Sequence, residues 1–186
     1  MKRPDECLNF ATREEWRAWL EQHHAAEREA WLIHYKKGVA GRAVTYEEAV
    51  EEALCFGWID GLLNRVDDER YALRYSPRRR RSIWSESNKR RVERLIAAGR
   101  MTAAGLEKVA EAKENGEWDA ATAREDVSNI PADLAEELER NAARPSFDAW
   151  PASRKKQYLF WLNSARKPES RQKRIQAIVE AATARE

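Results

Sequence analysis

The sequence contains little cysteine and histidine, and this excludes several kinds of site. Cys7 and Cys55 are the two cysteines among 186 residues, so the chain offers no disulfide framework and no metal-ligand spacing. His23, His24 and His34 all precede residue 35, and they are too few and too scattered for a zinc site without further ligands. We therefore expect neither a metal nor a cofactor.

Long apolar stretches are also missing. No run approaches the about 20 apolar residues that cross a membrane, and the N-terminal sequence MKRPDECLNF lacks the apolar stretch of a signal peptide. From these two absences we expect a protein with no membrane span and a cytoplasmic location.

Glycine and proline are few, at 7 and 6 residues, whereas 35% of the chain is charged. This composition is typical of a helix-rich globular protein. The net charge of +2 favours no particular partner, but the charges are unevenly distributed: residues 107–139 carry eleven acids and three bases, and residues 140–186 carry eleven bases and four acids. The simplest explanation of the basic tail is charge complementarity with the acidic segment.

Local signals divide the chain into elements. Thr12 and Thr45 each precede a glutamate by three residues, a capping box that predicts helices near 12–25 and 45–56. The remaining expected elements are strands at 30–36, 58–66 and 71–75 and helices at about 86–98 and 103–115.

These elements predict an α+β fold, with a small, mainly antiparallel sheet flanked by helices and followed by a C-terminal helical subdomain. We place an α+β domain at 1–116, an acidic connector at 117–130 and a helical region at 131–186.

A basic stretch in the middle of the chain is the candidate site. Between Arg74 and Arg94 there are nine Lys or Arg and two acids. Arginines next to tryptophans, hydroxyl groups and a helix start are the chemistry of an anion site. The candidate ligand-binding residues are Trp58, Asp60, Arg74, Arg78, Ser82, Trp84, Ser85 and Asn88.

Asp60 has two interpretations. It pairs with Arg74 or Arg78 to fix a hairpin, or it lies in a pocket with both, orienting an arginine or accepting a hydrogen bond from a ligand hydroxyl. Alternation along the strands places Trp58 and Asp60 on one face and sets Arg74 opposite the aromatic residues of its own strand. We expect Arg74 and Arg78 to point into the pocket, and the arginines at 79–81 and 90 to face water.

Ser82, Ser85 and Asn88 surround Trp84 where a helix begins. Helix capping explains one or two of them, but three beside four arginines exceed what a cap needs. Backbone N–H groups at that terminus also favour an anion. A phosphate, nucleotide or carboxylate site is the resulting hypothesis.

The same arginines offer a nucleic-acid surface as an alternative. Lys89, Arg90 and Arg94 are able to share the solvent side of the helix. The near-neutral net charge and the lack of a helix-turn-helix, zinc-finger or RNA-binding aromatic pattern favour a solvated basic face instead.

Catalytic motifs are missing from the sequence. There is no glycine-rich phosphate loop, HExxH or GxSxG. A triad of Asp60 with Ser82 or Ser85 would need His34 to come across the sheet. We therefore assign no catalytic residue.

Five segments of the sequence resemble the YdeI/OmpD-associated family, also called bacteriocin-protection proteins. They are FGWIDG (56–61), RYSPRR (74–79), SIWSESNKRRVERL (82–95), GRMTAAGL (99–106) and YLFWLNSARKPESRQKRI (158–175). The resemblance implies an association with resistance to cationic antimicrobial peptides and with a porin partner. It also implies a periplasmic location, which the N-terminal sequence does not favour.

Together these observations predict a non-enzymatic protein that binds a small anion or a protein partner in envelope or antimicrobial-peptide stress. The first alternative is an enzyme or nucleotide-binding protein that uses Asp60, Arg74 and Arg78. The second is weak nucleic-acid binding through the arginine run.

Overall fold

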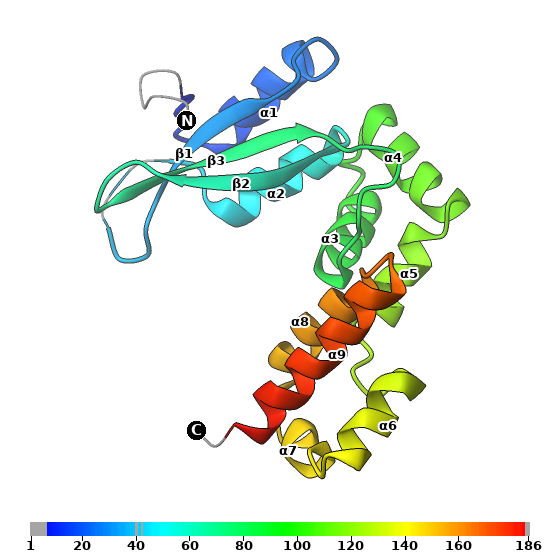
Figure 1. The fold of residues 1–186 in the computed structure, drawn as a ribbon. Helices are drawn as coiled ribbons and strands as arrows, with labels where there is room; N and C mark the ends of the chain where they lie inside the picture. Colours follow the sequence, from blue (N-terminus) through cyan, green and yellow to red (C-terminus); the bar gives the residue numbers. More distant parts are fainter. Residues whose placement is uncertain (1–6, 40, 42, 185–186) are drawn as a thin grey trace. The chain divides into compact units, whose positions relative to one another are not determined.

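The computed structural model describes residues 7–39, 41 and 43–184, and the chain divides into two units, Met1–Ala120 and Ala121–Glu186. In the first unit, strands β1 (Ala30–Tyr35), β2 (Trp58–Arg65) and β3 (Arg70–Pro77) form an antiparallel sheet in the order β1-β3-β2 (Figure 1). The sheet and its helices confirm the predicted α+β class.

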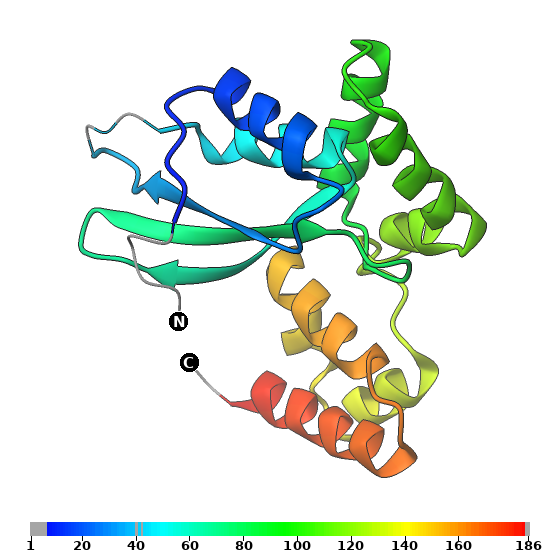
Figure 2. The same ribbon diagram turned by 90° about the horizontal axis from the view of Figure 1, so that it is seen from above.

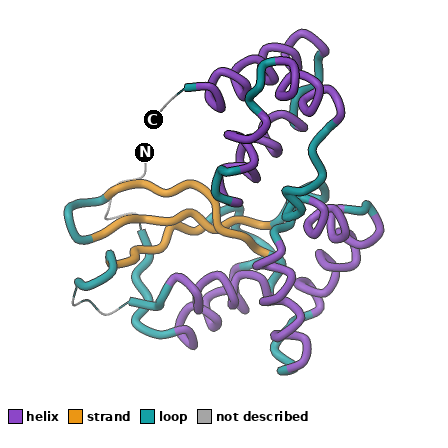
Figure 3. The backbone as a smooth tube through the Cα atoms, turned by 90° about the horizontal axis from the view of Figure 1, so that it is seen from below, coloured by secondary structure: helices purple, strands orange, loops and turns teal. Residues whose placement is uncertain are grey.

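Helices α1 (Arg13–His23) and α2 (Tyr46–Cys55) cover one face of this sheet, as the opposite views of Figures 2 and 3 both show. The Thr45 capping box is complete, and the Thr12 side chain accepts a hydrogen bond from the Glu15 N–H. The apolar sides of the helices bury Trp16 and Leu20, and the Trp16 ring lies 5.6 Å from that of Tyr75 on β3. The main core of the unit therefore lies between these helices and the sheet.

Three further helices follow the sheet: α3 (Glu86–Ala97), α4 (Ala103–Glu114) and α5 (Glu117–Ala123). The start of α4 fits closely against the end of α2, where a Cβ on Gly105 would lie 2.3 Å from the Cys55 carbonyl oxygen. The Thr102 hydroxyl donates to that same oxygen at 2.6 Å. A side chain larger than hydrogen at position 105 would therefore separate the two helices.

Helix α5 occupies the beginning of the segment 117–130, for which the sequence predicted a connector. The boundary between the two units falls inside this helix, after Ala120. Trp118 is buried and packs 5.1 Å from Trp84. The packing of Trp118 against Trp84 therefore orders the beginning of a segment for which the acidic composition predicted no packed structure.

A buried carboxylate joins the helices of the first unit. Glu52 on α2 is 0% exposed and is surrounded by three arginines. Arg13 and Arg17 reach it from α1 at 2.6 and 2.8 Å, and Arg100 reaches it at 2.5 Å from the loop between α3 and α4. Burial opposes the ionisation of Glu52, but the hydrogen bonds from the three arginines outweigh it and lower its pKa.

The second unit is helical, with α6 (Ala132–Arg140), α7 (Arg144–Asp148), α8 (Ala152–Asn163) and α9 (Pro168–Thr183). Its largest fully buried side chains are Leu134, Leu138, Phe147, Leu162, Ile175 and Ile178. Ion pairs Arg171–Asp133 and Lys156–Glu125 join the basic tail to the acidic segment, in line with the complementarity of their charges. No helix in the described part of the chain has the length and apolarity of a membrane span.

We expect Glu52→Gln to lower the free energy of unfolding of the first unit by about 3–5 kcal/mol at pH 7, because it leaves three arginine side chains around a neutral amide. Equilibrium urea unfolding measures this change. Glu21→Gln is the matched control, since Glu21 pairs with Arg17 while 57% of its side chain is exposed, and its loss should stay below about 1 kcal/mol.

The same pair of variants tests the pH dependence. A carboxyl whose pKa is lowered by folding stabilises the protein fully above its unfolded pKa of about 4.3, and this stabilisation is lost as the pH falls through the lower, folded pKa. The gap in unfolding midpoint between wild type and Glu52→Gln should therefore be constant from pH 7 to about 5 and shrink below about 4. A gap that is unchanged in acid contradicts this role for Glu52.

Candidate functional site

Arg78 is the centre of the basic stretch and lies inside the fold. Its N–H donates to the Gly57 carbonyl at 2.9 Å, which fixes the chain where β3 ends. Its guanidinium stacks on the Trp84 ring, with Cζ 3.8 Å from the ring centroid. The Nη1 group donates to the Ser82 hydroxyl at 3.0 Å and to the Ile83 carbonyl at 3.3 Å. The predicted residues Arg78, Ser82 and Trp84 therefore come together.

The other edge of the Arg78 guanidinium, formed by Nε and Nη2, is buried and has no hydrogen-bond partner among the described residues. The whole residue is 3% exposed. Burial lowers its pKa to about 10, although the nearby charge of Asp60 acts in the opposite direction. Nε and Nη2 are adjacent donors that match the two oxygens of a carboxylate or phosphate. Among the described residues, this edge is therefore the candidate position for an anion.

Behind Trp84 lies a second layer of rings and cations. Trp118 packs against Trp84, and the amino groups of Lys89 and Lys113 each lie 5.4 Å from a Trp118 ring centroid. Lys89 is 8% exposed, so the prediction that it shares the solvent side with Arg90 and Arg94 is wrong. The sequence spacing allowed that face, but the aromatic ring of Trp118 draws Lys89 toward the interior.

Asp60 lies on β2 directly opposite Tyr75 of β3, and Trp58 lies opposite Pro77. The strand register therefore puts Trp58 and Asp60 on one face, as predicted. Trp58 is 1% exposed and its Nε1 donates to the His24 carbonyl at 3.2 Å, so it belongs to the core.

The Asp60 carboxylate itself is partly exposed. Its Oδ2 accepts a hydrogen bond from the Tyr46 hydroxyl at 3.1 Å. Burial and the charge of Asp60 together raise the pKa of Tyr46 to about 12. Tyr46, at the start of α2, was not among the predicted site residues, because no sequence spacing links α2 to β2.

Arg74 lies apart from Asp60. Its cross-strand partner is Trp31, and its guanidinium pairs with Glu29 at 3.6 Å. Residues of one strand alternate between faces, so Arg74 is opposite Tyr75 and its partner Asp60. The alternation was predicted correctly, but the pocket that combined Arg74 with Asp60 and Arg78 is not formed.

Ser85 and Asn88 have separate tasks. The Ser85 hydroxyl accepts from the Asn88 N–H and caps α3. The Asn88 Oδ1 accepts from Arg91 Nη1 at 2.8 Å. Arg91 also binds Glu47 of α2 through two hydrogen bonds of 2.9 and 2.6 Å, and this pairing raises its pKa. Sequence reasoning missed Arg91; its position three residues after Asn88 was the available signal.

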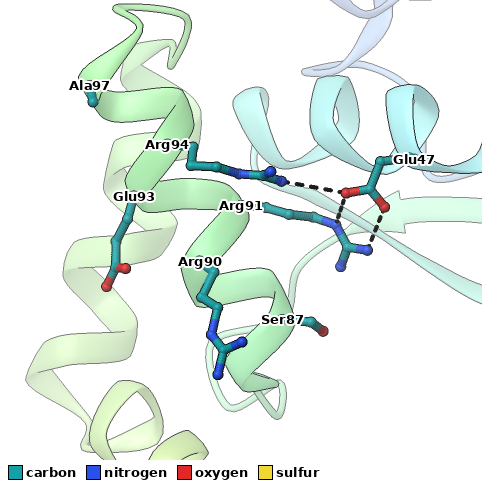
Figure 4. Close-up of a pocket in the computed structure, with 7 residues that line it drawn as sticks. All are labelled: Glu47, Ser87, Arg90, Arg91, Glu93, Arg94 and Ala97. Carbon is teal, nitrogen blue, oxygen red and sulfur yellow. Dashed lines mark hydrogen bonds and ion pairs between the residues drawn. The ribbon is translucent and has the colours of Figure 1, made fainter.

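A groove of about 590 Å³ runs along α3 beside α2 (Figure 4). It is lined by Glu47, Ser87, Arg90, Arg91, Glu93, Arg94 and Ala97. Arg91 and Arg94 both pair with Glu47, and Arg94 also pairs with Glu51. These ion pairs neutralise both guanidinium groups and join α3 to α2.

The arginine run is divided by the fold. Residues 79–81 and Arg90 are exposed, as predicted, whereas Arg78 is buried. Arg78 and Lys89 are buried, and Arg91 and Arg94 are paired with carboxylates, so four of the nine bases are less available to a nucleic acid.

His34 lies on β1, with β3 between it and Asp60 on β2. Its Nε2 is 3.3 Å from the Tyr75 hydroxyl, and burial lowers its pKa to about 4. Ser82 accepts from Arg78, and Ser85 caps α3. The predicted geometry of a triad with His34 is not formed. In the part of the chain that the structure describes, no three His, Cys, Asp or Glu side chains gather as a metal site requires.

We expect Trp84→Ala to lower the free energy of unfolding by about 3–5 kcal/mol, because it removes a buried ring that contacts both Arg78 and Trp118. Urea unfolding of the full chain checks this. The neighbouring Ile83→Ala is the control: Ile83 is 52% exposed, and the change should stay within about 0.5 kcal/mol. An equal loss of unfolding free energy in the two variants would show that the buried Trp84 ring contributes no more to stability than the exposed Ile83 side chain.

Comparison with known families agrees with the division into two units. The model described as "Bacteriocin-protection, YdeI or OmpD-Associated" matches residues 128–185, which contain α6 to α9. The FGWIDG and RYSPRRRRSIWSESN motifs lie instead within residues 8–108, which match the model "Domain of unknown function (DUF8412)". No curated protein and no solved structure matched the chain. Since the DUF8412 model covers more than half of its residues, the chain belongs to the DUF8412 family, with a YdeI/OmpD-associated segment at its C-terminal end.

Proposed function

We propose that this protein is a non-enzymatic binding protein that holds a small anion at Arg78. One observation carries the proposal: the Nε and Nη2 groups of Arg78, a residue that is 3% exposed, have no hydrogen-bond partner among the described residues. A buried donor without a partner costs about 1–3 kcal/mol, and more when it is charged. A bound carboxylate or phosphate would satisfy both donors and the positive charge at once.

The surroundings of Arg78 support this role. Trp84 and the Nη1 contacts to Ser82 and Ile83 hold the guanidinium in one orientation. A group that is fixed before binding loses little conformational entropy when the ligand arrives. The nearest negative side chain that acts on its pKa, Asp60, forms no ion pair with it in the described structure.

The YdeI/OmpD-associated match at 128–185 supports a second part of the proposal, a role in protection against bacteriocins or other antimicrobial peptides. The cytoplasmic location expected from the sequence stays a prediction.

Binding of simple anions to the full chain tests the proposal. We expect phosphate or a small carboxylate, at one hundred times its Kd, to increase the free energy of unfolding by about 2.7 kcal/mol. This stabilisation is measured as a rise in the melting temperature. Arg78→Lys keeps a positive charge but lacks the two adjacent donors, so it should abolish the shift. Isothermal titration calorimetry gives the Kd directly.

Arg79→Lys is the matched control, because Arg79 is adjacent in sequence and exposed. It should bind the anion like the wild type. The circular dichroism and unfolding midpoint of Arg78→Lys without ligand show whether the variant is folded. Equal anion binding by Arg78→Lys and wild type, or no binding of any anion by the wild type, would overturn the proposal.

A further inference from the structure

The second unit carries two aromatic side chains that its core does not use. Helix α8 directs Leu159 and Leu162 into that core, where both are buried. The two residues between them, Phe160 and Trp161, are 45% and 39% exposed. Adjacent large aromatic rings on a surface leave apolar area in contact with water, and a partner that covers them gains the free energy of removing it.

The space beside these rings is shallow. A hollow of about 390 Å³ is lined by Gln157, Tyr158, Phe160, Trp161 and Ser164, all of which lie on α8 or at its C-cap. An amphipathic peptide helix binds in a groove, and a groove needs walls from more than one element. A single helix presents a convex surface instead, so the rings suit a flat partner better than a peptide chain.

Basic residues gather where α8 passes into α9, and the two helices lie side by side in Figures 1 and 2. Residues 152–174 contain eight Lys or Arg and one acid. Arg166 and Lys167, in the loop between the helices, are exposed. Arg174 of α9 lies over the Trp161 ring, with Cζ 5.1 Å from the centroid, and donates to the Ser164 hydroxyl at 2.9 Å. The partner that complements these charges is anionic.

We name this the α8–α9 surface; it consists of Phe160, Trp161, Arg166, Lys167 and Arg174. We propose that it binds an anionic lipid surface. Phe and Trp rings enter the boundary between headgroups and acyl chains, and neighbouring Lys and Arg side chains are attracted to anionic lipids. The long side chain of Arg174 keeps its charge at the level of the headgroups while the Trp161 ring goes deeper.

A single-stranded nucleic acid is the other anionic partner that combines with aromatic and basic residues. Its bases stack on free ring faces. Arg174 already lies over the Trp161 ring, and the Tyr158 ring meets Trp161 at 73° with the centroids 6.3 Å apart. The Trp161 ring therefore has less free surface for stacking, and a lipid surface, which needs no stacking, is the better fit.

Co-sedimentation of the full chain with vesicles tests the proposal. Vesicles of phosphatidylglycerol and phosphatidylcholine in equal parts are compared with vesicles of phosphatidylcholine alone. We expect the anionic vesicles to bind at least about tenfold more tightly. Raising the salt from about 0.1 M to about 1 M shortens the Debye length from about 10 Å to about 3 Å and should release most of the bound protein.

Arg166→Gln combined with Lys167→Gln tests the charges. Each basic residue near an anionic lipid surface contributes a factor of about five, so this double variant should bind the anionic vesicles about 25-fold more weakly. Lys36→Gln combined with Lys37→Gln is the matched control, because it removes two adjacent, exposed charges from the first unit. It should bind like the wild type. An equal loss in both double variants would show that net charge alone matters and would overturn the α8–α9 surface.

Phe160→Ala tests the apolar contact and should weaken vesicle binding by about tenfold, since it removes an aromatic ring from the bilayer boundary. Ile96→Ala is the matched control, because Ile96 on α3 is also 45% exposed, and it should bind like the wild type. Circular dichroism shows that both variants are folded. Unchanged binding by Phe160→Ala contradicts the proposal.

Two further outcomes would overturn the lipid partner. The first is that the wild type binds no anionic vesicles at low salt. The second is that a single-stranded oligonucleotide or polyglutamate binds through Arg166 and Lys167 while the vesicles do not, which would assign the α8–α9 surface to a nucleic acid or to an acidic protein.

Discussion

Burial of the Glu52 carboxylate sets the arrangement of the first unit. A charge without water is tolerated only where opposite charges and hydrogen-bond donors surround it, and here they come from α1 and from the loop after α3. Satisfying one side chain therefore fixes three segments that are far apart in the sequence. The start of the same helix is held by the Thr45 capping box, and there Tyr46 meets Asp60 and Glu47 meets Arg91.

Arg78 is a buried charge of the opposite kind. Glu52 has every neighbour that its charge requires, whereas Arg78 has an aromatic ring on one face, two acceptors on one nitrogen and a free edge on the other side. This difference between the two buried charges is the basis of the proposed anion site at Arg78. Buried groups of this kind are typical of functional sites, where local stability is exchanged for binding.

Much of the fold could be predicted from local sequence. Thr45 and Glu48 form the capping box that their spacing indicated, and the alternation on β3 correctly set Arg74 opposite its aromatic neighbours. Capping and strand alternation depend on residues no more than three or four positions apart, so both can be recognised in the sequence. The site was predicted less completely: Arg78, Ser82 and Trp84 do come together, but Arg74 pairs with Glu29, and the contributions of Tyr46 and Arg91 were missed.

The sequence by itself determined the elements, the α+β class and the concentration of arginine before α3, because propensity, capping and alternation depend on near neighbours. Only the tertiary structure decided which arginines are buried, which are paired with carboxylates and which face water. Arg78 and Arg79 are the same amino acid at adjacent positions, yet Arg78 is buried against Trp84 and Arg79 is exposed. The Arg78 side chain is held by Ser82, Ile83 and Trp84, four to six residues later, while its backbone N–H binds the distant Gly57 carbonyl. The Gly57 contact and the carboxylate partners of Arg91 and Arg94 come from distant segments, so they exist only once α2, α3 and the sheet have packed together.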